Sequence, residues 1–338
     1  MVVDGNDPAA VERAAERLAE GGLVAFATET VYGLGARADD DAAVARIFAL
    51  KGRPSGHPLI VHVAGAPEAQ HFAAPLPPVA ARLVEAFWPG PLTVIVPRLP
   101  GVASAAAGGH ATIGLRSPAH AVAHGLLVAA RRLGVPGIAA PSANRFGRVS
   151  PTRAAHVADE FGADLLVLDG GPCRIGIESS IVDCSGPVPR LLRPGVLAPE
   201  RLEAAAGVSL QPSADGAAAA PGTLAAHYAP RAQVRLMASP ALHAALQLLD
   251  AAPLGLAVYS RMVPSGVAPG LRHRRMPARP EQAAHELFSV LRELDDEGVQ
   301  LIWVEEPPPG TDWDGVRDRL TRAAASQVGG RTFPWSME

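Results

Sequence analysis

The 338-residue chain is organised around two neighbouring stretches, ATETVYGLG (27–35) and KGRPSGHPLIVHV (51–63). The second stretch opens with Lys51, the one lysine among the 30 lysine and arginine residues. An ammonium is a compact charge on a flexible stem and a guanidinium is a broad planar fork, so a site that needs one cannot simply accept the other. Lys51 is therefore a candidate functional residue. The competing interpretation is a lysine that survives by chance at a helix end.

Length and composition predict a globular protein of two domains. A chain of 338 residues is long for a single hydrophobic core. Hydrophobic residues make up 48% and charged residues 19% of it, and no apolar run is long enough to span a bilayer. The N-terminus lacks the pattern of a secretion signal, and Cys173 and Cys184 suit a reducing compartment better than a disulfide or metal pair. We therefore expect a cytoplasmic protein without membrane contact.

Charge is distributed unevenly along the chain. The net charge of −3 gives no general case for nucleic-acid binding. Between Glu85 and Asp159, however, there is no acidic residue, and such a segment is expected to present a positive field to an anionic ligand. Cover by acidic helices from elsewhere in the chain is the alternative. The arginines of this segment are Arg98, Arg116, Arg131, Arg132, Arg145, Arg148 and Arg153.

Residue patterns predict an α/β fold for the N-terminal part. Asp7 before Pro8 is a good helix start, and the acidic run 39–41 begins a helix that ends at Lys51. Short apolar runs between such helices are typical of buried strands. A hairpin is expected to pair 178–183 with 190–195. The other expected helices are 76–87, 119–132 and 151–161, and the expected strands are 23–27, 58–63, 93–97, 111–116, 137–140 and 165–168.

Two loops contain residue types that bind small polar ligands. The strand at 137–140 runs into PSANRFGRVSPT (141–152), a polar and basic loop, and open α/β sheets bind ligands where strands end in this way. This loop matches neither the P-loop nor the dinucleotide fingerprint. TETVYGLG (28–35) combines hydroxyls with two glycines that let backbone approach a ligand, although it could equally be only a turn. His57 and His62, taken alone, are more often packed core residues than ligands.

A linker and a second domain are expected beyond residue 206. Residues 207–232 have no periodic apolar face and are rich in small residues and proline, yet they end with the bulky pair His227-Tyr228, as though the segment docks on something. Strands at 234–237, 254–259 and 299–304 alternate with helices at 240–251, 281–297 and 314–326. This alternation predicts a small parallel α/β domain. The run RHRR (272–275) is interpreted as surface.

Six motifs in this order resemble the YrdC-like family of threonylcarbamoyl-AMP synthases over roughly residues 8–205. They are TETVYGLG, KGRP with HPLIVH, ATIGLR, AAPSAN, ESSIVD and LRPG. The linker ending HYAP and the α/β tail resemble the longer form of that enzyme. The resemblance implies an open twisted α/β catalytic domain with a basic concavity (1–206), a linker or lid (207–232) and a small Rossmann-like parallel α/β accessory domain (233–338).

The implied activity is that of a nucleotidyltransferase. The family joins L-threonine, bicarbonate or CO2, and ATP into threonylcarbamoyl-AMP with release of pyrophosphate, and needs no covalent enzyme intermediate. Downstream proteins then transfer the threonylcarbamoyl group to tRNA, and the resemblance leaves a weak RNA contact open. Mg²⁺ is expected to arrive with ATP, and no dedicated metal cage is expected because magnesium usually keeps waters and substrate oxygens as ligands.

The resemblance also implies roles for single residues. Lys51 and Arg53 are the expected catalytic cations, Lys51 against the phosphates or the carbamoyl oxygen, and Arg116 is the expected partner of the amino-acid carboxylate. The positions that match threonine contacts are Thr30, His62, Arg116, Ala140 and Ser179. The positions that match ATP contacts are Arg53, His57, Thr112, Ser142, Ser150, Arg193 and Tyr228, and Tyr32, Asn144 and Ser180 are further candidates.

Two rival functions come from other classes. A non-catalytic RNA-binding module would also use a basic concavity, but aromatic residues make up only 4% of the chain and its net charge is slightly negative. A carbamoyltransferase-type maturation factor normally carries acylphosphatase and zinc-finger segments, and two cysteines cannot supply the latter. Pyrophosphate release that depends on ATP and threonine separates the synthase from a pure binder.

Overall fold

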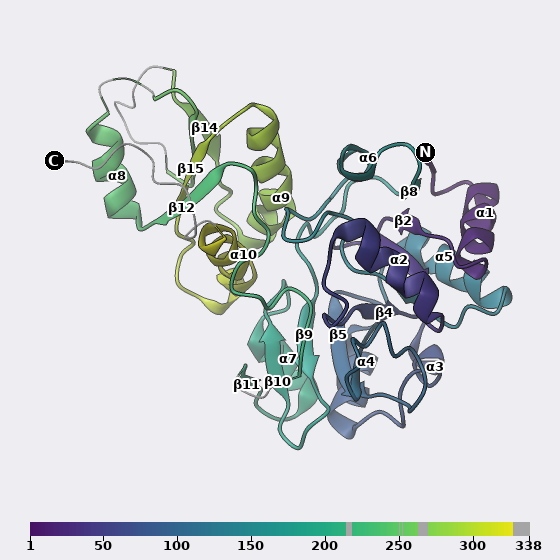
Figure 1. Cartoon of the computed structure of the whole chain (residues 1–338). Coiled ribbons are helices and arrows are strands. Elements are labelled where there is room, and N and C mark those ends of the chain that lie inside the picture. The colour runs from purple at the N-terminus through teal and green to yellow at the C-terminus, as the bar shows by residue number, and fades with distance from the viewer. Residues whose placement is uncertain (214–217, 250, 252, 263–269, 327–338) are drawn as a thin grey trace.

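The structure is a computed structural model that describes residues 1–213, 218–249, 251, 253–262 and 270–326. It has two lobes, each built on its own β-sheet (Figure 1). Part of the predicted linker (214–217), the end of the helix predicted at 240–251 (residue 250) and the last part of the predicted second domain (327–338) lie outside the described residues.

The first lobe holds an 11-stranded mixed sheet. Its strands are β1 (Val2–Asp4), β2 (Val24–Phe26), β3 (Gly33–Arg37), β4 (Ile60–His62), β5 (Leu92–Pro97), β6 (Thr112–Arg116), β7 (Ile138–Ala139), β8 (Leu166–Asp169), β9 (Ser180–Asp183), β10 (Arg190–Arg193) and β11 (Gln211–Pro212). They lie in the order β1-β8-β2-β3-β7-β4-β6-β5-β9-β10-β11. The helices are α1 (Pro8–Ala19), α2 (Asp41–Lys51), α3 (Ala66–Ala69), α4 (Pro78–Phe87), α5 (Ala121–Arg132), α6 (Ala154–Phe161) and α7 (Pro199–Ala206).

The second lobe holds a four-stranded sheet in the order β12-β15-β13-β14, in which every neighbouring pair is parallel. The predicted parallel α/β architecture of this part is thus confirmed. Its elements are β12 (Gln233–Met237), α8 (Ser239–Gln247), β13 (Leu256–Ser260), β14 (Arg272–Arg275), α9 (Pro280–Asp296), β15 (Leu301–Glu305), the 3₁₀ helix η1 (Thr311–Trp313) and α10 (Asp314–Ala325).

Helices cover both faces of the first sheet. Successive side chains of a strand point to opposite faces. In β2, Val24 and Phe26 pack into the apolar cluster formed with α1 and α5, while Ala25 packs into the larger cluster formed with α2 and α4 on the other face. The continuous apolar sequence of this strand follows from burial on both sides.

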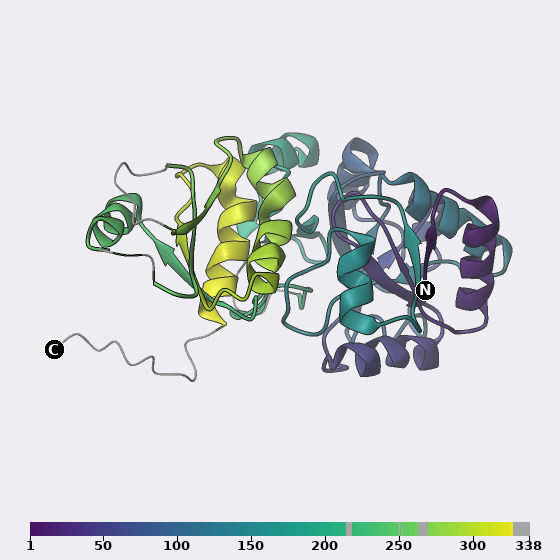
Figure 2. The same ribbon diagram turned by 90° about the horizontal axis from the view of Figure 1, so that it is seen from above.

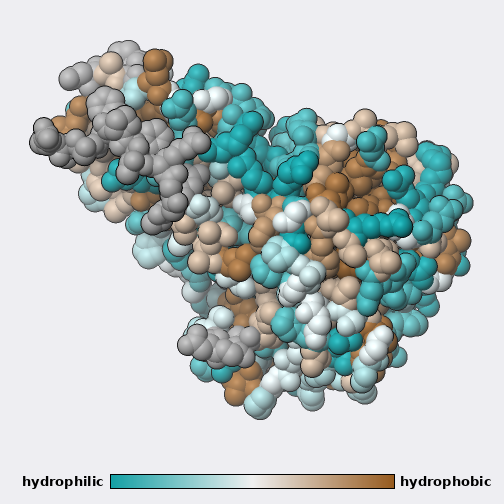
Figure 3. Space-filling view, viewed as in Figure 1, coloured by the Kyte–Doolittle hydropathy of each residue, from teal (hydrophilic) through white to brown (hydrophobic). Residues whose placement is uncertain are grey.

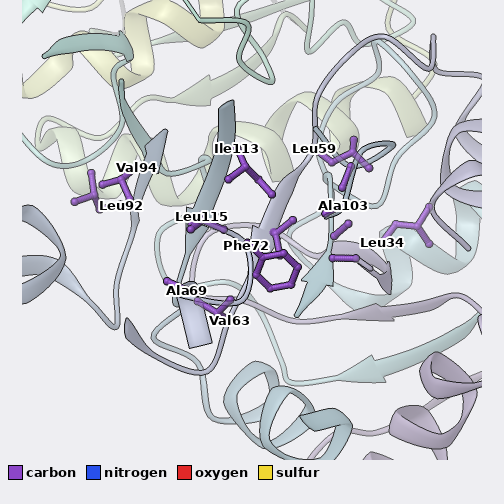
Figure 4. Packing of buried hydrophobic residues seen from close by; sticks show 14 of the residues in the cluster. Leu34, Leu59, Val63, Ala69, Phe72, Leu92, Val94, Ala103, Ile113 and Leu115 are labelled. Atoms are coloured by element: carbon purple, nitrogen blue, oxygen red, sulfur yellow. The ribbon is translucent and has the colours of Figure 1, made fainter. Parts of the chain in front are cut away.

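Phe72 lies inside the larger cluster (Figure 4). Its fully buried ring is surrounded by apolar side chains that include Val63, Ala69 and Leu115. A Cβ at Gly137, just before β7, would lie 2.7 Å from this ring. The start of β7 therefore reaches the ring only because residue 137 has no side chain.

Helix α2 delivers Lys51 to the middle of the first lobe. The side chain of Asp40 caps the helix N-terminus by accepting hydrogen bonds from the amides of Ala42 and Ala43 at 2.9 and 3.2 Å. Gly52 ends the helix in the left-handed conformation, with φ of 64°, which glycine adopts without a steric penalty. Lys51 is the last helical residue, as the sequence predicts, and its side chain is 3% exposed.

The two lobes share an apolar core. Val31, Val149 and Ile177 of the first lobe pack with α9 and α10 in one cluster that also contains Tyr228. Viewed from above, these two helices lie side by side in the second lobe on the side that faces the first (Figure 2). At the surface, hydrophilic residues gather along the border between the lobes (Figure 3). Among the described residues, no helix is both long and apolar enough to cross a membrane.

Three segments that the sequence analysis interprets in other ways contain strands. Part of the predicted turn at 28–35 continues into β3, which pairs with β2 and β7. The RHRR run, interpreted as surface, forms the edge strand β14. Charged side chains are common in edge strands because they prevent further pairing, so the composition of this run did not indicate a strand. The predicted linker contributes β11, which pairs with β10 through two residues. The segment predicted as a linker or lid thus begins with two residues that extend the first sheet.

Candidate active site

Strand ends and loops of the first lobe surround one cavity together with residues 221–228. The cavity is defined by its lining, which includes nine of the predicted site residues: Thr30, Arg53, His62, Arg116, Ala140, Ser142, Ser179, Arg193 and Tyr228. Its other polar lining residues are Thr28, Glu178 and His227. Strands and loops that are distant in the sequence thus meet at the place where the sequence predicts a ligand.

Arg116 forms the best-defined charged group of the cavity. Its guanidinium lies 2.7 Å from Oε1 of Glu29, and both side chains are almost fully buried. Nη1 of Arg116 also donates to Oγ1 of Thr30 at 2.9 Å. Glu29 was not predicted, because its carboxylate lies behind Arg116 and pairs with a residue far away in the sequence. The contact is an ion pair, because neither carboxylate oxygen of Glu29 has a partner with hydrogen-bond geometry among the described residues.

His62 lies in β4 beside this pair. It is 4% exposed, and its Nδ1 has no hydrogen-bond partner among the described residues. Burial, followed by the positive charge of Arg116, lowers the pKa of His62 to about 3. The imidazole is therefore neutral at pH 7 and one ring nitrogen can accept or donate a hydrogen bond to a ligand in the cavity.

Arg193 connects β10, Ser179 and the linker. Nε donates to the carbonyl oxygen of Ser179 at 3.0 Å, Nη2 donates to its hydroxyl at 3.2 Å, and Nη1 donates to the carbonyl oxygen of Pro221 at 2.9 Å. A Cβ at Gly222 would lie 2.9 Å from the same Nη1 and would collide with the hydroxyl of Tyr228. Glycine at position 222 therefore allows the linker to lie directly on Arg193.

Arg53 is the third arginine of the cavity. Nη2 donates to the carbonyl oxygen of Pro58 at 3.1 Å, and the guanidinium lies 5.7 Å from the ring centroid of Phe146. Burial is the largest influence on its pKa, which falls to about 10, and the charge of Arg193 acts in the same direction. Two arginines that repel each other in this way favour an anionic ligand between them.

Lys51 holds the loop that follows β7. Its Nζ donates to the carbonyl oxygen of Ser142 at 2.6 Å and to the carbonyl oxygen of Asn144. The amide of Phe146 in turn donates to the carbonyl oxygen of Lys51 at 2.9 Å. Burial, and then the charge of Arg53, lower the pKa of Lys51 well below its ordinary value. Lys51 does not itself line the cavity; it lies behind Ser142.

The remaining predicted residues lie outside the lining. The hydroxyl of Tyr32 is 2.9 Å from Oδ1 of Asp169, so it fastens the residues before β3 to the end of β8. Asn144 donates to the carbonyl oxygens of Arg145 and Arg148 within its own loop. Three others lie near strand starts or in loops, namely Ser150 bonded to Glu178, Ser180 at the start of β9 and Thr112 at the start of β6. His57 packs with its ring centroid 5.6 Å from that of Phe146.

The prediction that the acid-free segment supplies the positive field is wrong. Of its seven arginines, Arg116 alone lines the cavity. Arg131 pairs with Glu68 of α3, Arg132 with Glu12 of α1, and Arg148 with Asp295 of α9. Acidic residues of other helices thus pair with three of the seven arginines, which favours the alternative that the sequence left open. The other cations at the cavity, Arg53 and Arg193, come from outside it.

Residues of the predicted linker form one side of the cavity. Tyr228 is 1% exposed and has a φ of 61°, a left-handed conformation that is uncommon for a residue with a side chain. Its ring stacks on Phe288 of α9 at 5.5 Å, and the ring of His227 lies 4.2 Å away. The volume of the cavity is about 50 Å³, which is room for a few water molecules, since about 10–15 Å³ holds one.

Fold and site together define a two-domain α/β protein with a cavity that is lined by Arg53, Arg116 and Arg193. Residues 16–195 match the Sua5/YciO/YrdC family model, described as telomere recombination, and residues 197–325 match the model of the threonylcarbamoyl-AMP synthase C-terminal domain. The chain belongs to the Sua5/YciO/YrdC family, in the form that carries this C-terminal domain.

Relatives along nearly the whole chain support this membership. The threonylcarbamoyl-AMP synthase of Pyrococcus abyssi is 39% identical over 326 residues, covering 93% of this chain and 94% of the relative. The Bacillus subtilis enzyme of the same name is 37% identical over 336 residues, covering 96% and 95%. The solved structure of P. abyssi Sua5 complexed with L-threonine superimposes with a TM-score of 0.86 and 35% identity, covering 96% of this chain and 98% of that one.

Proposed function

We propose that the chain is a threonylcarbamoyl-AMP synthase, which condenses L-threonine, bicarbonate or CO2, and ATP into threonylcarbamoyl-AMP and pyrophosphate. The observation that carries this proposal is the convergence of Arg53, Arg116 and Arg193 on one buried cavity in a member of this family. The names of the relatives favour catalysis over the alternative of a non-catalytic RNA-binding module.

Threonine is proposed to bind at Arg116. The guanidinium offers a planar fork that matches a carboxylate, and Glu29 behind it keeps the pair of side chains neutral in the absence of a ligand. Neutral His62, with the hydroxyl of Ser179 across the cavity, suits the amine or hydroxyl of the amino acid. The L-threonine complex of P. abyssi Sua5 supports an amino acid as one substrate.

ATP is proposed to bind between Arg53 and Arg193 and to displace the linker. A cavity of about 50 Å³ is far too small for a nucleotide, so residues 221–228 must move outward before ATP enters. The contact that must open is the hydrogen bond from Arg193 to the carbonyl oxygen of Pro221. Tyr228 then closes over the bound nucleotide as a lid, in agreement with its bulky and strained place in the linker.

The chemistry needs positioning and positive charge. The threonine amine attacks CO2 and loses a proton to solvent to form a carbamate, or it reacts with bicarbonate to give the same carbamate and water. A carbamate oxygen then attacks the α-phosphorus of ATP. The bond between this phosphorus and the oxygen that bridges it to the β-phosphate breaks, and pyrophosphate leaves with the electron pair. Arg53 and Arg193 stabilise the charge that develops on the phosphate oxygens.

Lys51 is proposed to assist the attack on ATP by holding the loop that contains Ser142 and Asn144. It has three N–H donors, and two of them hold the carbonyl oxygens of Ser142 and Asn144. These bonds fix the loop that contributes Ser142 to the cavity, and the third donor is available for a phosphate or carbamoyl oxygen. An arginine at this position would be too wide for the space between the two carbonyls.

Magnesium is proposed to arrive on the nucleotide. Glu178 is the single carboxylate in the described lining of the cavity, and it already bonds Ser150 and Arg319. Nor do the described residues contain a group of three or more His, Cys, Asp or Glu side chains that could hold a metal ion. The residues present therefore fit a metal held by phosphate oxygens and water. When bound, it would neutralise charge on the leaving pyrophosphate.

The wider setting follows from this activity. We propose that proteins of tRNA threonylcarbamoyl transfer consume the product, that any RNA contact is weak, and that the protein acts in the cytoplasm. The domain boundaries proposed for it are 1–206 for catalysis, 207–232 for the linker or lid and 233–338 for the accessory part.

Pyrophosphate release tests the proposal. Wild-type protein should release pyrophosphate when ATP, threonine and bicarbonate are all present and should fail when any one is left out. Arg116→Met should abolish the threonine-dependent release of pyrophosphate, because it removes the proposed partner of the threonine carboxylate. Arg131→Met is the matched control, since Arg131 belongs to the same segment but pairs with Glu68 outside the cavity. Release without threonine in the wild-type protein would refute the proposed function.

A further inference from the structure

A buried arginine of the second lobe extends into the catalytic lobe. Arg319 lies on α10 and is 0% exposed, the largest fully buried side chain among the described residues. A guanidinium cannot be left in an apolar interior without partners, since its five N–H groups all need acceptors and its charge needs compensation. The role of Arg319 can therefore be inferred from its hydrogen-bond partners.

Most of those partners belong to the first lobe. Nε donates to Oε2 of Glu178 at 2.9 Å, and Nη2 donates to the backbone carbonyl oxygen of the same residue at 3.2 Å. Nη1 donates to the carbonyl oxygen of Pro194 at 2.6 Å and to Oδ2 of Asp318 at 3.0 Å. One planar group thus contacts two separate segments of the first sheet, one before β9 and one after β10.

These two segments carry residues of the cavity. Glu178 lines the cavity and precedes Ser179, and Pro194 follows Arg193. The other oxygen of Glu178 accepts a hydrogen bond from Ser150 at 2.5 Å. Burial raises the pKa of Glu178, but the charges of Arg319 and Arg193 and its two hydrogen bonds outweigh this and leave the pKa below the ordinary value. Glu178 therefore stays ionised and paired.

Arg319 also contacts Tyr228 of the linker. Its guanidinium lies 5.4 Å from the ring centroid of Tyr228, within the range of a cation–π contact. The hydroxyl of Tyr228 has no hydrogen-bond partner among the described residues, so the ring is held by its faces and not by its polar end. Phe288 of α9 stacks on it with an angle of 29° between the planes. The docked position of the lid residue thus depends on the second lobe.

Two glycines bring the lobes close enough for these contacts. A Cβ at Gly315 of α10 would lie 2.5 Å from the carbonyl oxygen of Gly195. A Cβ at Gly176, which has a φ of 86°, would collide with the backbone carbonyl oxygen of His285 in α9. Backbone therefore lies against backbone at two places where the lobes meet, on α10 and on α9.

We propose that Arg319 is a positioning residue for the nucleotide side of the active site, through which the second lobe holds Glu178, the residue after Arg193 and the ring of Tyr228 in place. This inference rests on the proposed synthase function and assigns to the second lobe a direct part in it. Arg319 touches no substrate. It acts on ATP through Arg193 and Tyr228. Arg116 and His62, two of the three residues proposed above to bind threonine, have no bond to it.

The experiment compares Arg319→Gln and Arg319→Lys with the matched control Arg317→Gln. Arg317 lies on the same helix, but it bonds Asp314 and the carbonyl oxygens of Pro308 and Gly310 within its own lobe. Three readouts are taken for each protein: the melting temperature, the KM values for ATP and threonine from pyrophosphate release, and hydrogen exchange at the amide of Ala229. That amide donates to the carbonyl oxygen of Gly147 at 2.9 Å and reports docking of the linker without any catalysis.

Arg319→Gln should raise the KM for ATP about tenfold or more and change the KM for threonine less than about threefold. Exchange at Ala229 should accelerate about tenfold, because the linker loses its support. Lysine should restore only part of both effects, since one ammonium cannot bridge acceptors that a planar fork spans. Arg317→Gln should behave as wild type in all three readouts.

A folded Arg319→Gln protein with wild-type ATP kinetics and wild-type exchange at Ala229 would overturn the proposal. An equal rise in the KM for ATP and the KM for threonine, together with a lower melting temperature, would also overturn it, since Arg319 would then only join the lobes. If the glutamine variant does not fold, the lysine variant decides by the same criteria. Failure of the proposed function itself is recognised separately, because wild-type protein would then release no threonine-dependent pyrophosphate while the exchange readout stays interpretable.

Discussion

Replacing Glu29 by glutamine should destabilise the protein and make it respond more strongly to threonine. Glu29 and Arg116 are 1% and 3% exposed, and their charges lie 2.7 Å apart. Removing one partner of such a buried pair costs about 3–5 kcal/mol. Glutamine keeps one acceptor oxygen, so we expect about 3 kcal/mol, which lowers the Tm by about 6–12 °C at about 2–4 °C per kcal/mol.

Added threonine should offset much of this loss. Its carboxylate would supply the negative charge that Arg116 has lost, so the variant gains more from the ligand than the wild-type protein does. At a concentration of 100 times Kd, an ordinary ligand stabilises by about 2.7 kcal/mol. Thermal melts of both proteins with and without L-threonine measure the difference.

The control is Glu12→Gln, which removes an exposed ion pair with Arg132 that is expected to contribute about 0–1 kcal/mol. An unchanged Tm in Glu29→Gln would contradict the buried pair. A variant that no longer responds to threonine would show that Glu29, and not Arg116, holds the amino acid.

Three further predictions use other parts of the site. Tyr228→Ala should raise the KM for ATP about tenfold by removing the lid residue, with kcat less affected; an unchanged KM rejects the lid. Lys51→Arg should lower kcat about tenfold or more although the charge is kept, because a wide guanidinium would push apart the carbonyls of Ser142 and Asn144, and wild-type turnover would show the lysine to be accidental. The pKa of His62 is lowered to about 3, against about 6.5 in the unfolded chain, so between these values the unfolded state binds the extra proton and stability falls as the pH drops from 6.5 toward 3. Urea titrations should show a shallower acid loss in His62→Gln than in wild type, and identical slopes would exclude His62 as a contributor.

The sequence predicts the elements better where local signals suffice. Asp7 and Asp40 cap helices that start within one residue of the caps, and Gly52 ends α2 directly after Lys51. These signals act over a few residues and are visible in the chain. Strands such as β11 and β14 were missed because their pairing partners, and not their own apolar content, decide that they are strands.

Local signals in the sequence likewise identify only part of the candidate site. The family motifs identify Thr30, His62 and Arg116, which lie in a single cavity. Glu29 and Glu178 escaped notice because each is defined by an arginine that is distant in the sequence, 141 residues away in the case of Glu178 and Arg319. The arginines of the acid-free segment were overcounted for a related reason, since three of the seven pair with acidic residues on other helices.

The central claim is that one cavity binds both substrates side by side. A crystal structure of the protein with L-threonine and a non-hydrolysable ATP analogue tests it most directly. We predict the threonine carboxylate on Arg116, the triphosphate between Arg53 and Arg193, and Tyr228 against the nucleotide. A nucleotide bound elsewhere, for example in the polar hollow between the lobes beside Arg153 and Arg275, with Arg53 and Arg193 still covered by the linker, would contradict it.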